Sequence, residues 1–409
     1  MKKFDKDKYL KNLNFKRNLT KYGKYFYIGV PCVLAVVAGF YFAYSKFTVS
    51  KDVEVVKTTV GEFIHGDVVI GAYIDGKYST TIPGKNDGYA VKSVSCDNNA
   101  TGSWDKDKWG LTLTNMTKRT KCNIYFETKK NSVNDVINEA VNTNSSMFAS
   151  DDAAKNVRYI GANPNNYVYF NCSDYNNQSD STCEKWRIIG AFNNVTKSDG
   201  TKENLVKIIR DESIGNIAWD SNNVNDWSTA TLQQNLNSGT YYTTTLKNDT
   251  TRNAIESVVW NLGGTDAYNT STASMFYTAE RGTTVYSGRP TTWTGKIGLM
   301  YPSDYGYATA GGSTTNRATC LSTVLYNWDG SGVADCKNND YLFKSSYVQW
   351  TLAPSSGLAF NVFNVYSNGN VDYDVAYDAR GVRPALYLKS SISVGSGNGT
   401  STSPYKLEM

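Results

Sequence analysis

The sequence predicts an α+β protein, mostly β, with one membrane-spanning segment near its N-terminus. Residues 25–45 contain no charged side chain, which is typical of a transmembrane helix. After residue 46, short runs rich in β-branched and aromatic residues alternate with Gly, Asn, Asp and Ser, which is typical of strands and turns. Only a few short segments show helical spacing of apolar residues.

The uncharged segment Tyr25–Ser45 is long enough to cross a bilayer as a helix, because at about 1.5 Å per residue it spans roughly 30 Å. Residues 1–24 carry nine Lys or Arg against two acids, which predicts a cytoplasmic tail and an exported remainder. A cleaved signal peptide is the alternative, with Ala43 and Ser45 at suitable spacing. The long basic leader and the long apolar run favour an uncleaved signal anchor. We therefore expect a single-pass cell-membrane protein with an extracellular C-terminal part.

The basic character of the chain belongs to the predicted tail. The whole chain has a net charge of +5 and the first 24 residues have +7, so the remainder has −2. A nearly neutral exported part argues against nucleic acid as a partner.

An even count of six cysteines outside the membrane segment indicates disulfides in an oxidising compartment. Of the fifteen possible connectivities we favour three pairs of cysteines that are close in the sequence, because each would close a loop inside one predicted domain. They are Cys96 with Cys122, Cys172 with Cys183, and Cys320 with Cys336. Zinc is the competing interpretation, but no C-x-x-C motif occurs and His65 is the single histidine. One histidine also excludes Ser-His-Asp, Cys-His and HExxH chemistry, and no Walker or GxGxxG motif is present.

The exported part divides into two predicted domains. Residues 46–130 read as a small, sandwich-like all-β stalk with a hairpin at Asp75-Gly76. Residues 131–146 read as a short helix, with Ser132 as its N-cap, and a linker. Residues 147–409 read as one domain of many short strands, with helices at Thr229–Asn237, capped by Ser228, and at Thr250–Trp260. The tail Val394–Ser403 is rich in Gly, Ser and Thr and is expected to be flexible unless Pro404–Leu407 docks as a last strand.

Five segments in order resemble a family of uncharacterised surface domains of Gram-positive bacteria. They are Lys185–Gly190 (KWRIIG), Trp227–Asn237, Gly298–Ala308, Gln349–Pro354 and Gly381–Leu388 (GVRPALYL). That family is similar to the C-type-lectin-like fold of formylglycine-generating enzymes and of the variable proteins of diversity-generating retroelements. The resemblance covers about residues 165–407. It implies a C-type-lectin-like C-terminal domain.

Most residues of these motifs are expected to have structural roles. Trp186, Trp227 and Trp350 are expected in the core, and Pro384 in an edge strand or at a strand start. Arg383 is expected to form a buried fork to a carboxylate such as Asp304 or Asp378.

The predicted ligand-binding face lies between Trp350 and Arg383. This region resembles the variable region of the retroelement-diversified proteins, and it is rich in side chains that suit adaptable binding surfaces. The candidate residues are Asn361, Asn364, Tyr366, Asn370, Asp372, Tyr373, Asp374, Tyr377 and Asp378. An AT-rich genome would also produce this composition.

Carbohydrate is one candidate ligand, because thirty Tyr and nine Trp offer stacking platforms. A calcium-assisted site would use Asp329 and Asp335, or Asp372 and Asp374, but neither loop holds a full ligand set. The formylglycine-generating branch depends on a reactive cysteine pair. Cys320 and Cys336 have no matching motif around them, so we expect a structural disulfide and no enzyme activity.

These observations predict a membrane-anchored bacterial surface protein that displays an adhesin-like domain binding an external protein or glycan. The alternatives are a structural cell-envelope component without a dedicated ligand and a retroelement-diversified variable receptor. No resident cofactor or metal is expected.

Overall fold

The computed structural model describes residues 56–58, 68–85, 87–116, 118–128 and 131–409. The chain divides into two compact units, Met1–Lys129 and Lys130–Met409, here called the first and second units. Strand accounts for about 36% and helix for about 19%, so the mostly-β α+β prediction is confirmed at this level. Within the described ranges no helix is long and apolar enough to cross a membrane. The predicted tail 1–24, the anchor 25–45 and His65 lie outside those ranges.

The first unit contains two sheets, of strand order β3-β2-β7-β4 and β1-β6-β5. Leu111, Leu113, Ile124 and Phe126 from the two sheets form a shared core. The strands are β1 Val56–Thr58, β2 Val68–Ile74, β3 Lys77–Ser79, β4 Tyr89–Cys96, β5 Thr101–Asp105, β6 Gly110–Thr114 and β7 Thr120–Thr128.

The predicted hairpin at Asp75-Gly76 is present and joins β2 to β3. Both turn residues have positive φ, 47° and 80°, as a two-residue hairpin turn requires. Strand β5 was not predicted. Its Gly102 permits a close approach to β4, since a Cβ there would lie 2.5 Å from Val94 Cγ1.

The second unit opens on helix α2 (Val133–Thr143), which was predicted to begin after Ser132. Ser132 Oγ accepts from the Asp135 backbone N–H, and the Asp135 carboxylate accepts from the Ser132 N–H, which forms a capping box. Val133 and Ile137 are buried in the core of the second unit. The helix is therefore part of this unit's fold.

The larger sheet of the second unit has the order β16-β21-β12-β11-β9-β8, and β10 also pairs with β11. The KWRIIG and ALYL segments lie in β11 and β21, and Pro384 directly precedes β21 as expected. The strands are β8 Phe148–Ala149, β9 Val157–Tyr159, β10 Tyr167–Phe170, β11 Glu184–Thr196, β12 Lys202–Arg210, β16 Ile297–Gly298 and β21 Ala385–Leu388.

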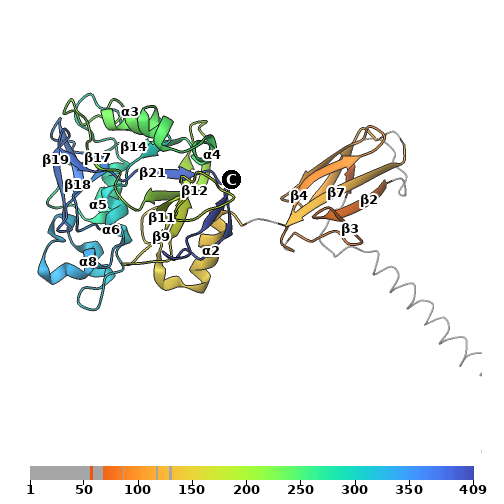
Figure 1. The fold of residues 1–409 in the computed structure, drawn as a ribbon, viewed down its shortest axis with the longest axis horizontal. Helices are drawn as coiled ribbons and strands as arrows, with labels where there is room; N and C mark the ends of the chain where they lie inside the picture. The colour runs from red at the N-terminus through yellow and green to blue at the C-terminus, as the bar shows by residue number, and fades with distance from the viewer. Residues whose placement is uncertain (1–55, 59–67, 86, 117, 129–130) are drawn as a thin grey trace, which may run out of the picture. The chain divides into compact units, whose positions relative to one another are not determined.

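The second sheet of this unit has the order β13-β20-β17-β18-β19. Figure 1 shows α5 (Ala273–Glu280) and α6 (Pro302–Ala308) between this sheet and the larger one, and α6 contacts β9, β17 and β18. The strands are β13 Asn216–Ala218, β17 Gln349–Pro354, β18 Asn361–Val365, β19 Val371–Val375 and β20 Ala379–Gly381.

Short elements complete the unit. The pair β22–β23 docks the C-terminal tail, with Leu407 buried, which is the docked one of the two alternatives that the sequence left open. The other elements are η1 Ser145–Met147, α3 Thr231–Asn237, the π-helix η2 Tyr241–Thr245, α4 Asp249–Ala254, β14 Val258–Asn261, β15 Thr292–Gly295, α7 Arg317–Ser322, η3 Leu325–Asn327, η4 Ser331–Val333, α8 Ala334–Asn338, β22 Ser393–Ser396 and β23 Lys406–Glu408.

Two helix predictions were partly wrong. Helix α3 begins at Thr231, and Ser228 binds Asp226 instead of capping it. The cap comes from a distant residue, because the Asp220 carboxylate accepts from the Thr231 N–H. The helix predicted at Thr250–Trp260 ends at Ala254, and Val258–Asn261 form β14, where β-branched and aromatic residues favour a strand.

All three predicted cysteine pairs form disulfides, one in the first unit and two in the second. Cys96 and Cys122 are direct partners across β4 and β7. These bridges are consistent with an extracellular protein.

The three predicted core tryptophans are at most 1% exposed. The carboxylate partner predicted for Arg383 was wrong, because its guanidinium donates to the carbonyls of Arg210 and Leu342 and to Gln349 Oε1. The N–H groups of a buried guanidinium can be satisfied by uncharged carbonyl and amide oxygens, and the sequence does not show that such oxygens lie nearby.

Candidate functional site

The predicted ligand-binding face is divided between the two sides of one hairpin, β18–β19. The strand register pairs Asn364 with Asp372 and Val362 with Asp374, which places these side chains on one side. Asn361 and Tyr373 belong to the opposite side, where the Tyr373 ring contacts Tyr268 and Phe363. Tyr377 and Asp378 lie after β19, ahead of β20. Asn370 sits at the hairpin turn, where its carbonyl accepts from the Tyr366 N–H.

Asp374 is the centre of a hydrogen-bond network on this hairpin. Its Oδ1 accepts from the Tyr366 hydroxyl at 2.6 Å, and its Oδ2 accepts from Asn364 Nδ2 and Arg380 Nε, both at 2.7 Å. Arg380 also donates to Asp378 at 2.9 Å. These hydrogen bonds engage side-chain groups that were predicted to contact a ligand. The network therefore stabilises the hairpin.

Burial further limits which of the predicted residues can contact a ligand. Asn364 is 0% exposed and Asn361 6%, whereas Tyr377 is 56% exposed. Burial, with the neighbouring charge of Asp374, raises the pKa of Asp372 above its ordinary value. Of the nine candidates, Tyr377 is the one large side chain that the structure presents openly to solvent.

Two further exposed apolar residues, which the sequence did not single out, lie in the segment before β18. Leu358 is 37% exposed and Phe360 is 40% exposed, both in the segment that leads into β18. The Phe360 carbonyl accepts from the Ala376 N–H at 2.7 Å, which brings Phe360 beside Tyr377. We call Leu358, Phe360 and Tyr377 the apolar trio. Hydrophobic residues in a Gly/Ser-rich connection, SSGLAF, were the available signal.

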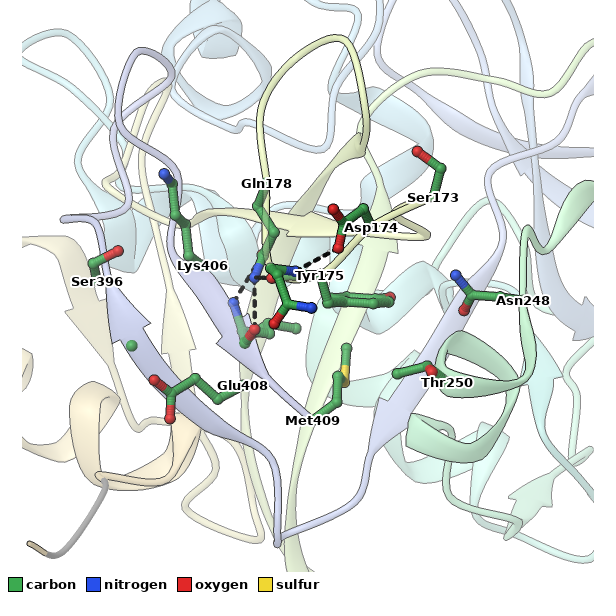
Figure 2. A pocket seen from close by; sticks show the side chains of 13 residues that line it. Ser173, Asp174, Tyr175, Gln178, Asn248, Thr250, Ser396, Lys406, Glu408 and Met409 are labelled. Carbon is green, nitrogen blue, oxygen red and sulfur yellow. Dashed lines mark hydrogen bonds between the residues drawn. The ribbon is translucent and has the colours of Figure 1, made fainter.

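One cavity of the second unit has a volume of about 690 Å³ and lies beside the C-terminal strand. Figure 2 shows Gln178 in this cavity, where its Nε2 donates to the Leu407 carbonyl and its Oε1 accepts from the Leu407 N–H. Tyr175 and Thr251 share a hydroxyl–hydroxyl bond at 2.9 Å. None of the nine predicted residues lines this cavity.

A smaller cavity, of about 290 Å³, lies beside a buried charge cluster. Asp304 in α6 accepts from Arg158 Nη1 at 2.7 Å, from Lys207 Nζ at 2.5 Å and from the Tyr301 N–H at 3.0 Å. Arg158 also donates to Asp152 at 2.8 Å. Burial alone would raise the pKa of Asp304, but Lys207 and Arg158 lower it well below its ordinary value.

Glu280 is the second buried acid beside this cavity. It accepts from the Ser303 N–H and hydroxyl and from Arg281 Nη1. Burial raises its pKa to about 7, an effect that the Arg281 charge offsets only in part. From the sequence, Asp304 is expected only as a partner of Arg383, because nothing in the local sequence links residues 158, 207, 280 and 304.

The aspartates weighed for calcium are engaged in other contacts. Asp335 accepts from the backbone N–H groups of Thr314 and Thr315, and Asp329 accepts from Asn368. In the described part of the chain no three His, Cys, Asp or Glu side chains gather in a metal-binding group.

Comparisons of this chain with protein-family models, with curated proteins and with solved structures returned no match.

Proposed function

We propose that this chain is a membrane-anchored bacterial surface protein whose second unit binds an external partner through the apolar trio. The uncharged segment 25–45 after a basic tail supports anchoring with an extracellular C-terminal part. The three disulfides support an oxidising compartment.

The apolar trio is the observation that carries the binding proposal. Large apolar side chains left open to water at one place are typical of interaction surfaces. Tyr at such a place supplies contact area at low entropic cost and is frequent among binding hot spots. The Asp374 network holds the adjoining hairpin in one conformation, which lowers the cost of binding. These features favour a protein over a glycan as the partner.

The finer fold assignment is part of the same proposal. The first unit would serve as a sandwich-like stalk, and the second would be a C-type-lectin-like domain. Support comes from the ordered motifs in residues 165–407 and from the placement of KWRIIG and ALYL in one antiparallel sheet.

Site-specific photo-crosslinking on intact cells tests the proposal. A photoreactive amino acid at position 377 should capture a defined external protein. The same group at position 78 is the matched control, since Tyr78 is also exposed, at 67%, but lies in the first unit.

The affinity of the captured protein for the purified full chain should then fall at least about 10-fold in Tyr377→Ala and stay unchanged in Tyr78→Ala. Equal affinities for both variants would contradict the proposed surface. Absence of any specific adduct at position 377, together with a blank glycan array, would favour the structural cell-envelope alternative.

A further inference from the structure

The 290 Å³ cavity of the second unit is lined by aromatic, aliphatic and small polar side chains and a single charged residue, Arg281. Its lining comes from β11, β14, α5 and β21 and from the segments next to them, so that distant parts of the chain fix its shape. The volume lies near the lower end of the roughly 300–1,000 Å³ usual for small-molecule sites. One sugar ring or a molecule of similar size suits such a space.

Arg281 is fixed along one edge of its guanidinium and unpaired along the other. Nη1 donates to the Tyr277 carbonyl at 3.1 Å and to Glu280 Oε2 at 3.0 Å. The guanidinium carbon lies 3.5 Å from the centroid of the Tyr277 ring. Nε and Nη2 have no hydrogen-bond partner among the described residues, and the side chain is 25% exposed.

An unpaired Nε–Nη2 edge presents two nearly parallel N–H groups, which is the geometry that binds a carboxylate through both oxygens. The contacts of Nη1 and the stacking on Tyr277 hold this edge in place before a ligand arrives, so little rotamer freedom remains to be lost. The structure thus offers a preformed carboxylate fork.

The charges around the cavity favour an anion. No acidic side chain lines it. The acids behind the wall are already engaged, Glu280 by Arg281 and Ser303 and Asp304 by Lys207 and Arg158. Lys207 Nζ lies 4.5 Å from the centroid of the Tyr301 ring, but its charge is paired with Asp304, so the positive charge at the cavity lining is that of Arg281.

The rest of the lining suits hydroxyl groups. Both amide donors of Asn193 are taken by backbone carbonyls, which leaves its Oδ1 as an acceptor. The side chains of Asn194 and Asn261 make no hydrogen bond to any described residue and offer both donors and acceptors. Trp260 and Tyr387 add apolar ring surface of the kind that packs against a sugar.

We propose that this cavity binds a small sugar acid, with its carboxylate on the Nε–Nη2 edge of Arg281 and its hydroxyls on the asparagine side chains. The proposal is independent of the apolar trio, because none of the trio lines the cavity.

Isothermal titration of the purified full chain with D-glucuronate and with D-glucose tests the proposal, since the two probes differ in one carboxylate. Glucuronate should bind at least about 30-fold more tightly, as expected for a charge-assisted bidentate contact. Arg281→Gln should remove this preference. Arg281→Lys keeps the charge but loses the fork, and should weaken glucuronate binding at least about 10-fold. Arg289→Lys is the matched control, because Arg289 also lies against a Tyr ring but not at this cavity, and it should leave binding unchanged.

Equal binding of the two sugars, unchanged affinity in Arg281→Lys, or no binding of glucuronate up to about 10 mM would each overturn the proposal. Modification of the wild-type chain by phenylglyoxal avoids any folding defect of the variants. Glucuronate should protect Arg281 from the reagent where glucose does not, and equal modification with both sugars would also overturn it.

Discussion

At the residue scale, Asp304 is the centre of a buried charge cluster in the second unit. The residue is fully buried and accepts hydrogen bonds from two buried cations. Removing one member of such a group leaves the other charges buried without compensation, which costs far more than breaking a surface pair. We therefore expect the cluster to contribute to the stability of this unit as well as to support the smaller cavity.

The variant Asp304→Ala should lower the free energy of unfolding by roughly 3–5 kcal/mol, because Lys207 would lose its charge partner. Asp249→Ala is the matched control, since it breaks an Asp–Arg pair in which the acid is 86% exposed, and it should cost less than about 1 kcal/mol. Urea unfolding measures both. Similar costs for the two variants would show that the buried cluster is not needed for stability.

Glu280 makes the stability of the fold depend on pH. Its pKa is about 7 when folded and 4.5 in its ordinary state, so between these values the unfolded chain loses the proton while the folded chain keeps it. The stabilisation that this pKa difference gives the folded state is complete below about pH 4.5. It is lost as the pH rises through 7 and amounts to on the order of 3 kcal/mol in total. The lowered pKa of Asp304 acts in the opposite direction, and its contribution is lost in acid.

The variant Glu280→Gln should therefore become more stable relative to the wild type between about pH 5 and about pH 8, because its side chain does not ionise. Urea unfolding curves of both proteins across that range measure the difference. Parallel pH profiles for the two proteins would contradict the assignment of this pH dependence to Glu280.

At the scale of elements, local signals were predicted well and distant contacts were not. The Asp75-Gly76 hairpin and the start of α2 each follow from a few adjacent residues. The cap of α3 comes from Asp220, eleven residues before the N–H that it accepts, and adjacent residues gave no sign of it.

The same limit applies to the candidate sites. The segment 350–383 was singled out, but composition could not tell which side of β18–β19 is covered, so Asn361 and Asn364 were predicted as ligand contacts although they are buried. The smaller cavity combines residues from 154 to 387, whose proximity exists only in the folded chain. Spacing along the sequence cannot reveal it.

The α2 capping box gives a test at this scale. Ser132→Ala removes the side chain that accepts from the Asp135 N–H and should cost about 1 kcal/mol. Ser146→Ala, an exposed serine three residues past the helix, should be close to neutral. Thermal unfolding of the full chain compares the two, and equal melting temperatures would mean that the cap does not stabilise the second unit.

At the scale of the whole molecule, the proposals share one requirement, which is that the second unit lies outside the cell. The basic tail, the uncharged segment 25–45 and the disulfides all support this arrangement. The apolar trio would then be presented to external proteins, and the smaller cavity to sugars of the medium or of the envelope.

Labelling of intact cells with a membrane-impermeant maleimide tests this requirement most directly. Ser367→Cys places a thiol at an exposed position of the β18–β19 turn, and Lys6→Cys places one in the predicted tail. We predict that the thiol at position 367 reacts on intact cells and that the thiol at position 6 reacts only after lysis. Labelling at position 6 with protection at position 367 would contradict the account.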